Sequence, residues 1–402
     1  MGWRLFVLAL GLALVVLEPC SFDDPAFLQD AQGADFDLDD LEAISLDPDP
    51  GELAAPRETT PLPPTLPPVQ PNAPVPALTG PWSFAVLSDI HAPNDGHMWP
   101  TIQHTVAALV AMHVRAVVIT GDFTNGSQTD GPVRVANAWR LWTAIRTALL
   151  PLRAAGIAVL PVAGNHDSYL PGHRALYAKA WADLETWAQP FRITTTTARR
   201  ATPQSGAPFS YGVDLGDVHF TLAHLVDRRS HPDVEAWMAA DLDAARSKAL
   251  RFVFGHVPMS SVAVATSKPY LARLGAIFER GHADVAIFGH EHLIWDENVK
   301  LPGGGVIREI LTGCTSGFYN YGPSHDSMRR ARCKPTRIAG KVEPQRCVMP
   351  NGGGEFVIQK HRRGRMIQHA RATFTIVTVD GSHVTSTPMA LDAAGNAVPF
   401  YL

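Results

Sequence analysis

The sequence predicts an α/β domain, a fold class in which helices cover the faces of β-sheets. Short apolar runs rich in Val, Ile and Phe alternate with longer segments whose apolar residues recur at helical spacing. This alternation is typical of sheets flanked by helices. The chain has 402 residues, of which 46% are hydrophobic, so it is long and apolar enough to bury a large core.

The predicted strands are short apolar runs spread along the chain. They are Phe84–Ser88, Ala116–Thr120, Ile157–Val162, Val218–Ala223, Arg251–Phe254, Val285–Phe288 and Val306–Leu311. Most are apolar at nearly every position, which indicates strands that are buried on both faces. Near the C-terminus, Ala372–Val379 and His383–Pro388 flank Asp380-Gly381 and predict a hairpin with a tight turn. A last strand pair is expected around Asn396.

Two segments between the first strands predict helices. Thr101–His113 and Val135–Leu150 each carry apolar residues on one face at helical spacing. In the second segment these residues include Trp139 and Trp142. We expect both tryptophans to belong to the core rather than to a ligand platform, because a regular apolar stripe is what a core-facing helix needs.

The first 20 residues have the features of an export signal. Arg4 precedes an unbroken apolar or small run, residues 5–17, which is too short for an ordinary membrane-spanning helix. Cys20 stands where a bacterial lipoprotein carries its lipid, although the residues before it match that signal poorly. We expect an exported protein that is periplasmic, secreted or anchored to the cell envelope through Cys20. A buried N-terminal helix is the alternative.

Residues 21–81 predict a disordered tether. Nearly every charge up to Glu58 is acidic, and the proline cluster Pro61–Pro68 favours an extended polyproline chain. The folded domain is therefore expected to span residues 82–402. A pro-segment that packs on this domain is the alternative interpretation of the tether.

An insertion interrupts the domain at about residues 317–369. It is rich in Gly, Pro and Arg and has no clear period, and a loop of this length is usually functional or disordered. Its basic residues could guide an anionic substrate, bind the acidic tether or an anionic surface, or simply be solvated. Aromatic residues that would stack bases are not interleaved with them, so nucleic acid is not an expected partner. Cys333 and Cys347 in the insertion are the favoured disulfide pair, and Cys314 is expected to be a free buried thiol.

Five polar motifs each follow a predicted strand. They are Asp89-Ile90-His91, Gly121-Asp122, Gly164-Asn165-His166-Asp167, Gly255-His256 and Gly289-His290-Glu291-His292. Because ligands collect outside the carboxyl ends of strands in α/β sheets, we expect these motifs to meet at one edge. Their carboxylate, amide and imidazole groups suit two adjacent divalent metals, a recognised device for hydrolysing phosphate esters. The glycines would let neighbouring loops approach closely.

In order and in full, these motifs resemble the pattern D-x-H, G-D, G-N-H-D/E, G-H and G-H-x-H of the calcineurin-like metallophosphoesterase superfamily. The resemblance covers roughly residues 82–313 and implies a four-layer α/β/β/α sandwich of two mixed sheets flanked by helices. It assigns to one metal the ligands Asp89, His91, Asp122 and His292. It assigns to the other metal the ligands Asp122, Asn165, His256 and His290. Asp122 would therefore bridge two divalent transition metal ions, with Zn, Mn, Fe and Ni as candidates.

The resemblance also implies a chemistry in which a metal-bridging hydroxide attacks phosphorus. His166 would serve the leaving group as proton donor or charge stabiliser, and Asp167 would orient His166. Glu291 either supports a metal ligand from behind or faces solvent. Residues in loops that directly follow predicted strands are further candidates: Asn94, His97 and Asp227.

The sequence therefore predicts an exported dinuclear metal-dependent phosphoesterase. We expect a phosphomonoesterase, and the segment Glu235–Leu242 resembles a helix of purple acid phosphatases. The tyrosine with which those enzymes bind ferric iron is missing after Gly121-Asp122, so a coloured iron site is not expected. A phosphodiesterase acting on a cyclic nucleotide or a phospholipid is the alternative. A non-catalytic envelope binding protein is a third, less favoured hypothesis. The expected partner is a small-molecule or lipid phosphoester.

Overall fold

The structure is a computed structural model. It describes the following ranges of the chain: 80–92, 98–124, 132–194, 202–260, 266–292, 294–316 and 372–399. At the start of the third range, only the helical backbone is described. These ranges belong to the compact unit Glu58–Leu402, and a second unit, Met1–Arg57, lies outside the described residues. The predicted signal, most of the tether, Cys20, Asn94 and His97 also lie outside them.

The predicted insertion is described only in part, as the backbone of short strand segments. Their bounds are β11 (Asn320–Tyr321), β12 (Arg337–Ile338), β13 (Lys341–Val342), β14 (Gln345–Val348), β15 (Glu355–Ile358) and β16 (Met366–Ile367). They pair two by two, as β11 with β16, β12 with β13 and β14 with β15. The predicted disulfide partners Cys333 and Cys347 lie outside the residues whose side chains are described.

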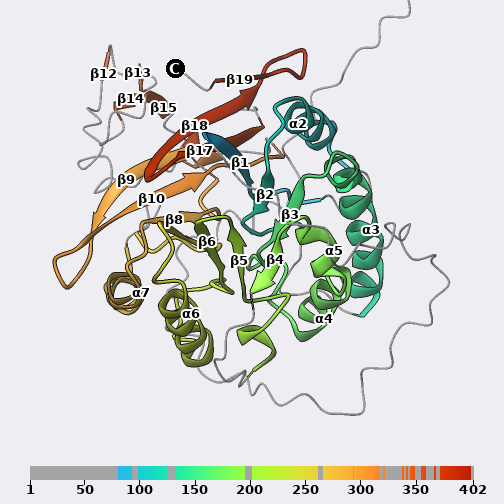
Figure 1. Ribbon diagram of the computed structural model, residues 1–402. Helices are drawn as coiled ribbons and strands as arrows, with labels where there is room; N and C mark the ends of the chain where they lie inside the picture. The colour runs from blue at the N-terminus through green and yellow to red at the C-terminus, as the bar shows by residue number, and fades with distance from the viewer. Residues whose placement is uncertain are drawn as a thin grey trace, which may run out of the picture. The chain divides into compact units, whose positions relative to one another are not determined.

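The first large sheet has six strands in the order β19-β18-β17-β1-β2-β3. Their bounds are β1 (Trp82–Leu87), β2 (Ala116–Ile119), β3 (Ala158–Pro161), β17 (Thr373–Asp380), β18 (His383–Leu391) and β19 (Ala397–Pro399). Strands β1, β2 and β3 are parallel, whereas β17 joins β1 antiparallel (Figure 1). The sheet is therefore mixed, and the predicted C-terminal hairpin supplies its antiparallel edge.

The second large sheet has seven strands in the order β4-β5-β6-β7-β8-β10-β9. Their bounds are β4 (Arg192–Thr194), β5 (Tyr211–Leu215), β6 (Val218–Leu222), β7 (Leu250–Phe254), β8 (Val285–Phe288), β9 (Ile294–Lys300) and β10 (Val306–Thr312). Strands β6, β7, β8 and β10 run parallel, and antiparallel strands close both ends.

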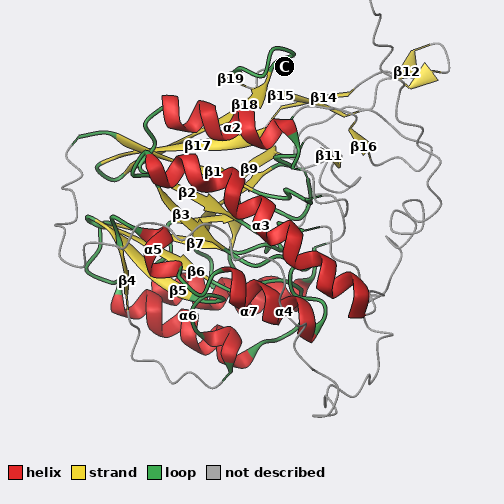
Figure 2. Ribbon diagram, turned by 90° about the vertical axis from the view of Figure 1, so that its right-hand side faces the viewer, coloured by secondary structure: helices red, strands yellow, loops and turns green. Residues whose placement is uncertain are grey.

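Helices form the two outer layers. They are α2 (Pro100–Ala111), α3 (Pro132–Ala154), α4 (Pro171–Ala180), α5 (Leu184–Ala188), α6 (Pro232–Ala244) and α7 (Lys268–Gly281), with the short 3₁₀ helix η3 (Pro203–Ser205). Helices α2, α3 and α4 pack on the first sheet, and α6 and α7 pack on the second (Figures 1 and 2). Helices α2, α4, α6 and α7 each carry a proline in the first turn, where its missing N–H costs no helical hydrogen bond.

The core between the two sheets is aromatic. Along β1, Phe84 and Val86 face the second sheet, whereas Ala85 and Leu87 face the helices. The Phe84 ring lies with its centroid 4.8 Å from that of Phe220 and 5.4 Å from that of Phe252, in edge-to-face contacts. Both faces of the parallel strands are thus covered, which explains why their sequences are apolar at every position.

The predicted fold class is confirmed: two mixed sheets lie between two layers of helices. Every predicted strand and helix is present, with ends that differ by a few residues. The sequence interpretation missed several elements: β4, β5, β9, α4, α5 and α7. Of these, β9 is an edge strand with the sequence IWDENVK, whose polar residues hide the alternation expected of a strand.

Candidate metal centre

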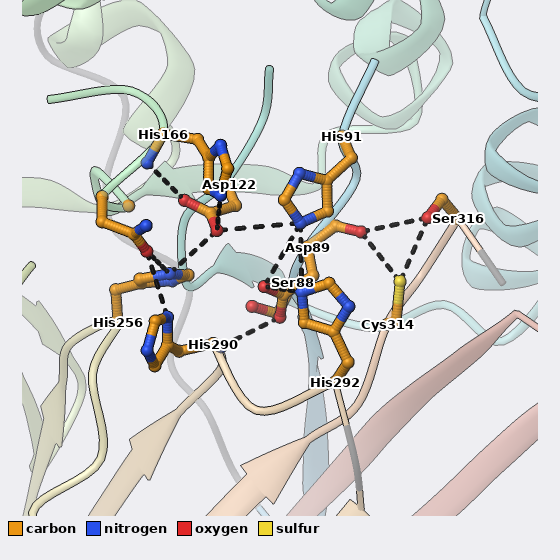
Figure 3. Close-up of polar contacts among 12 residues, drawn as sticks. Ser88, Asp89, His91, Asp122, His166, His256, His290, His292, Cys314 and Ser316 are labelled. Atoms are coloured by element: carbon orange, nitrogen blue, oxygen red, sulfur yellow. Dashed lines mark hydrogen bonds and ion pairs between the residues drawn. The ribbon is translucent and has the colours of Figure 1, made fainter. Parts of the chain in front are cut away.

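All five polar motifs lie at one end of the sandwich. Asp89, Asp122 and Asn165 follow the parallel strands β1, β2 and β3, and His256 and His290 follow β7 and β8 of the other sheet. Direct backbone bonds join the loops: Asp89 N donates to Gly121 O at 3.0 Å, and Gly289 N donates to His256 O at 3.1 Å. The motifs therefore meet across the two sheets, as the sequence predicts (Figure 3).

One group of side chains that could hold a metal consists of Asp89, His91, Asp122 and His292. All four are buried, and one ligand atom from each lies within 4.8 Å of the others. The two Nε2 atoms of His91 and His292 are 3.1 Å apart, and His292 Nε2 is 3.2 Å from Asp89 Oδ1. These are the residues that the resemblance assigns to one metal.

A second group consists of Asp122, His256 and His290. His256 Nε2 lies 3.1 Å from Asp122 Oδ2 and 2.7 Å from Asn165 Oδ1. The same amide oxygen of Asn165 lies 3.0 Å from His290 Nδ1. Asn165 thus joins this group, and Asp122 is shared by both groups, so the structure brings together both predicted ligand sets.

The spacing of these atoms fits metal ions. Two ligands bonded at about 2.1 Å to one metal are about 3.0–3.4 Å apart, depending on the bond angle. The contacts of His256 with Asp122 and of His292 with Asp89, at 3.1 and 3.2 Å, fall in that interval, whereas His256 and Asn165 are closer, at 2.7 Å. Imidazole, carboxylate and amide donors of this kind suit the borderline transition metals. The donor atoms converge on two points, as a dinuclear centre requires.

Burial keeps part of the imidazole set neutral, which metal binding requires. Burial is the main cause that lowers the pKa of His91 to about 3, and nearby His292 and His166 lower it further. Burial and then His256 lower the pKa of His290 to about 3. In His256, burial is outweighed by the Asp122 carboxylate, which raises the pKa to about 9. A metal ion would therefore replace a proton held between His256 and Asp122.

The orientation of His256 is fixed by the backbone. Its Nδ1–H donates to the carbonyl of Thr120 at 2.7 Å, so Nε2 is the atom that faces Asp122 and Asn165. A carbonyl on the far ring nitrogen is the usual partner of a metal-binding histidine, because it sets the tautomer.

The backbone at the site is strained at five predicted ligands. Positive φ values occur at Asp89 (54°), His91 (44°), Asp122 (53°), His290 (68°) and His292 (50°). Among the described residues other than glycine, the remaining positive values are at His113 and His282, which follow the helices α2 and α7. Left-handed backbone is uncommon in residues other than glycine, although Asp and His adopt it more readily than most, and it recurs at functional sites, where surrounding contacts enforce it.

Two glycines permit the close approach of the loops. Gly121 has φ of 102°, and a Cβ atom there would lie 2.6 Å from Gly164 Cα and 2.6 Å from His256 Nδ1. A Cβ atom on Gly164 would collide with the carboxylate of Asp122. Side chains at these positions would therefore push the Asp122 and Asn165 loops apart, which supports the role expected from the sequence.

The two predicted catalytic residues have different surroundings. His166 is partly exposed, with 22% of its side chain accessible, and its Nε2 lies 4.0 Å from Asp122 Oδ2. Asp167 is buried and accepts four hydrogen bonds, from the backbone N–H groups of Phe123, Thr124 and Gly164 and from the Thr124 hydroxyl. These bonds fill the lone-pair directions of a carboxylate. Asp167 therefore joins the loop that follows Asp122 to the loop that carries Asn165. Its predicted effect on the orientation of His166 stays a prediction.

Glu291 does not face solvent. The residue is only 3% exposed and lies near Glu309, a fully buried residue of β10. Burial raises the pKa of Glu309 well above its usual value. The Glu309 carboxylate accepts hydrogen bonds from the backbone N–H groups of Met259 and Ser260, on the loop that follows His256. Of the two alternatives for Glu291, the solvent-facing one is wrong.

Sequence reasoning missed the support behind Asp89. Cys314 is buried with a free thiol, as expected, and this thiol donates to the backbone carbonyl of Asp89 at 3.2 Å (Figure 3). The Ser316 hydroxyl donates to the same carbonyl at 3.2 Å. Thr315 and Ser88 exchange two further bonds, of 2.9 and 3.1 Å. The loop after β10 therefore holds the end of β1, and its sequence TGCTS has no spacing that would have revealed this.

The sequence profile of calcineurin-like phosphoesterases matches residues 83–293, which is more than half of the chain. The chain therefore belongs to the calcineurin-like phosphoesterase family, and its buried Asp and His clusters suggest a dinuclear metal site. The comparison with curated proteins gives no match.

Several solved structures are similar to this chain. The purple acid phosphatase PPD1 from yellow lupin (Lupinus luteus) has a TM-score of 0.48 and 11% identity, covering 81% of this chain and 54% of that chain. GAP50 from Plasmodium, described as the anchor in the inner membrane complex, has a TM-score of 0.44 and 12% identity over 78% and 85%. A dimetal phosphatase from Danio rerio has a TM-score of 0.40 and 15% identity over 58% and 87%. This chain spans about half the length of the lupin enzyme. All three scores are low, so family membership rests on the sequence profile.

Proposed function

We propose that the protein is an exported phosphomonoesterase that uses two divalent metal ions. The observation that carries the proposal is the convergence of two ligand groups on Asp122, beside the partly exposed His166. Asp89, His91, Asp122 and His292 would hold one ion, and Asp122, Asn165, His256 and His290 would hold the other. When bound, two such ions supply a nucleophilic oxygen and neutralise charge on the phosphate.

In the proposal, the residues around that centre hold one another in position, and one of them donates a proton. Asp122 accepts a 2.9 Å hydrogen bond from the backbone N–H of His166, which fixes the histidine loop against the shared ligand. The His166 ring packs edge-on against the His91 ring, with centroids 4.9 Å apart. The His166 side chain is partly exposed, with 22% accessible, and in the proposal it donates a proton to the leaving alcohol.

Monoester preference is supported by the resemblance of Glu235–Leu242 to a helix of purple acid phosphatases. This segment lies in α6, which precedes β7 and the loop of His256. A phosphodiesterase is the alternative. The deciding experiment is hydrolysis of p-nitrophenyl phosphate and bis-p-nitrophenyl phosphate by the full chain, with bound metals quantified. A higher kcat/KM for the monoester supports the proposal, and the reverse order supports the diesterase.

Two variants and a chelator test the metal centre itself. Asp122→Asn removes a charge shared by both ligand groups, so it should abolish turnover and release metal. Asp243→Asn is the matched control, because Asp243 is an exposed residue of α6 paired only with Arg246 at 2.6 Å among the described contacts. Turnover that survives both a chelator and Asp122→Asn would contradict the proposal. Two bound metals with no turnover of either ester would instead favour the envelope binding protein.

Export, the tether and membrane anchoring are part of the proposal. No helix among the described residues combines the length and the hydropathy needed to cross a bilayer. We propose that residues 1–20 are a signal, that 21–81 tether the domain 82–402, and that lipidation at Cys20 anchors the chain to the envelope. Cell fractionation of the full chain and of Cys20→Ser tests this. Loss of membrane association in the variant supports lipidation, and a cytoplasmic wild type contradicts export.

A further inference from the structure

The loop between β6 and α6, residues 223–231, is attached to both halves of the metal centre. Leu225 O accepts the backbone N–H of His256 at 3.2 Å and that of Val257 at 2.9 Å. On the other side, His224 Nε2 lies 3.1 Å from the Ser168 hydroxyl, on the loop that carries Asn165 and His166. The residues of this loop are therefore held at the rim of the site.

Arg174 lies on the same rim and has an unusual environment. It belongs to the first turns of α4, is half-buried, and donates from Nη1 to the Ser168 carbonyl at 2.8 Å. Ser168 is one turn from Asn165, because its N–H donates to the Asn165 carbonyl at 3.0 Å. The guanidinium therefore contacts the same loop that carries the predicted metal ligand Asn165.

No carboxylate within the described part of the chain pairs with Arg174. Burial, and second the nearby Arg229, lower the pKa of Arg174. The carboxylate of this rim, Asp227, is already engaged: it accepts from Arg229 Nη2 at 2.8 Å and lies 2.8 Å from His231 Nε2. A guanidinium that is partly desolvated beside another cation is stabilised by an added anion.

The neighbours of Arg174 do not weaken the positive electrostatic potential around it. Burial, with His231 and Arg174 as further causes, lowers the pKa of His224 to about 3, so His224 stays neutral and adds no competing charge. The positive charge next to the loop of Asn165 and His166 therefore comes from Arg174, with Arg229 nearby.

We propose that Arg174 forms an anion-binding subsite beside the metal centre that takes a second negative group of the substrate. The preferred substrates are then phosphoesters whose alcohol carries another phosphate or a carboxylate. The inference rests on the proposed function, because it names the substrate class of the same site. Four donors of the Arg174 guanidinium remain after the bond to Ser168, enough for a bidentate contact with either group.

Three aryl phosphates test the subsite: phenyl phosphate, 4-carboxyphenyl phosphate and phenylene-1,4-bisphosphate. Each is compared between wild type and Arg174→Gln, so differences in leaving-group reactivity cancel. The glutamine keeps an N–H donor, on a shorter side chain, but has no charge. We expect kcat/KM to fall about 10–100-fold for at least one of the two substrates with a second anion, the value of a charge-assisted hydrogen bond. For phenyl phosphate it should change by less than about threefold.

Controls separate a subsite from a structural role. Arg246→Gln removes an exposed arginine just after α6 that is paired with Asp243, and it should leave all three rates unchanged. Arg174→Lys should recover part of the loss, because it restores the charge without the fork. An equal fall for all three substrates with Arg174→Gln, or no fall for any, overturns the subsite.

The wild type gives a second measure that needs no variant. Salt should raise KM more steeply for the doubly anionic substrates than for phenyl phosphate, because an additional pair of charges is screened. Equal salt dependence would count against the subsite. Absence of metal-dependent turnover of phenyl phosphate by the wild type would instead contradict the proposed function, so the two failures are distinguishable.

Discussion

Two buried histidines of the second sheet show how a metal centre differs from a closed ion-pair cluster. His219 on β6 and His256 after β7 are both buried, and neighbouring carboxylates raise the pKa of each to about 9 against the effect of burial. Their partners differ. His219 has Asp214 Oδ1 at 2.8 Å on one ring nitrogen and Asp241 Oδ2 at 2.9 Å on the other, so both nitrogens are occupied.

His256 has one ring nitrogen tied to the Thr120 carbonyl and the other directed at both Asp122 and Asn165. Several donor atoms thus face one point, and the backbone of Asp122 is left-handed there. The His219 cluster lies on the regular hairpin of β5 and β6, where Asp214 and His219 are opposite each other. Burial beside a carboxylate is therefore not sufficient for a metal site; converging donors on a strained backbone distinguish it.

The largest effects should come from removing one ligand of either group. His256→Ala and His292→Ala should each reduce bound metal from about two ions to about one per chain, because each serves one ion only. Turnover should fall further than the roughly 10–100-fold typical of losing an outer partner. Elemental analysis and p-nitrophenyl phosphate hydrolysis measure both effects.

His104→Ala is the control for these ligand variants. His104 is an exposed residue of α2, away from both ligand groups. If either ligand variant retained two ions and full turnover, the assignment of that residue to a metal would be wrong. The His256 variant also tests the comparison with His219, because a cluster of closed ion pairs would lose stability but no metal.

His166→Ala should have the next largest effect, and only on turnover. The ring belongs to neither ligand group, so both ions should remain bound. Loss of a general acid should lower kcat about 10²–10⁴-fold. The loss should be smaller for p-nitrophenyl phosphate than for an alkyl phosphate, because nitrophenolate leaves without a proton. Equal losses for both substrates would leave His166 with an electrostatic role instead of proton donation.

Cys314→Ala should weaken metal binding without changing the chemistry. It removes one of two donors to the Asp89 carbonyl, while the Ser316 hydroxyl remains. We expect metal affinity to fall about tenfold, measured by chelator competition, and kcat at saturating metal to stay near that of wild type. Cys314→Ser keeps a donor and should recover most of the affinity. A loss of kcat at saturating metal in both variants would mean that the thiol has another role.

The parts of the site that could be predicted from the sequence are those that depend on local patterns. Runs such as AVVI of β2 are buried on both faces, and the motifs follow them at once, so strands and ligands were found together. Contacts between distant segments have no such local pattern. The thiol of Cys314 reaches Asp89 across 225 positions, and the guanidinium of Arg174 matters only because the loop 223–231 packs against Ser168.

The smallest predicted effect concerns stability and comes from His219. Its folded pKa of about 9 lies above the unfolded value of about 6.5, so the ion pairs with Asp214 and Asp241 stabilise the fold fully below pH 6.5. Between pH 6.5 and 9 the unfolded chain loses this proton first, and the stabilisation declines. His219→Gln should lower the free energy of unfolding by about 1–3 kcal/mol at pH 6 and by clearly less at pH 9.5. Urea unfolding of both proteins with a chelator present measures this without metal linkage. The same difference at both pH values would mean that His219 contributes packing rather than charge. A loss of bound metal in the variant would mean that His219, like His256, supports metal binding.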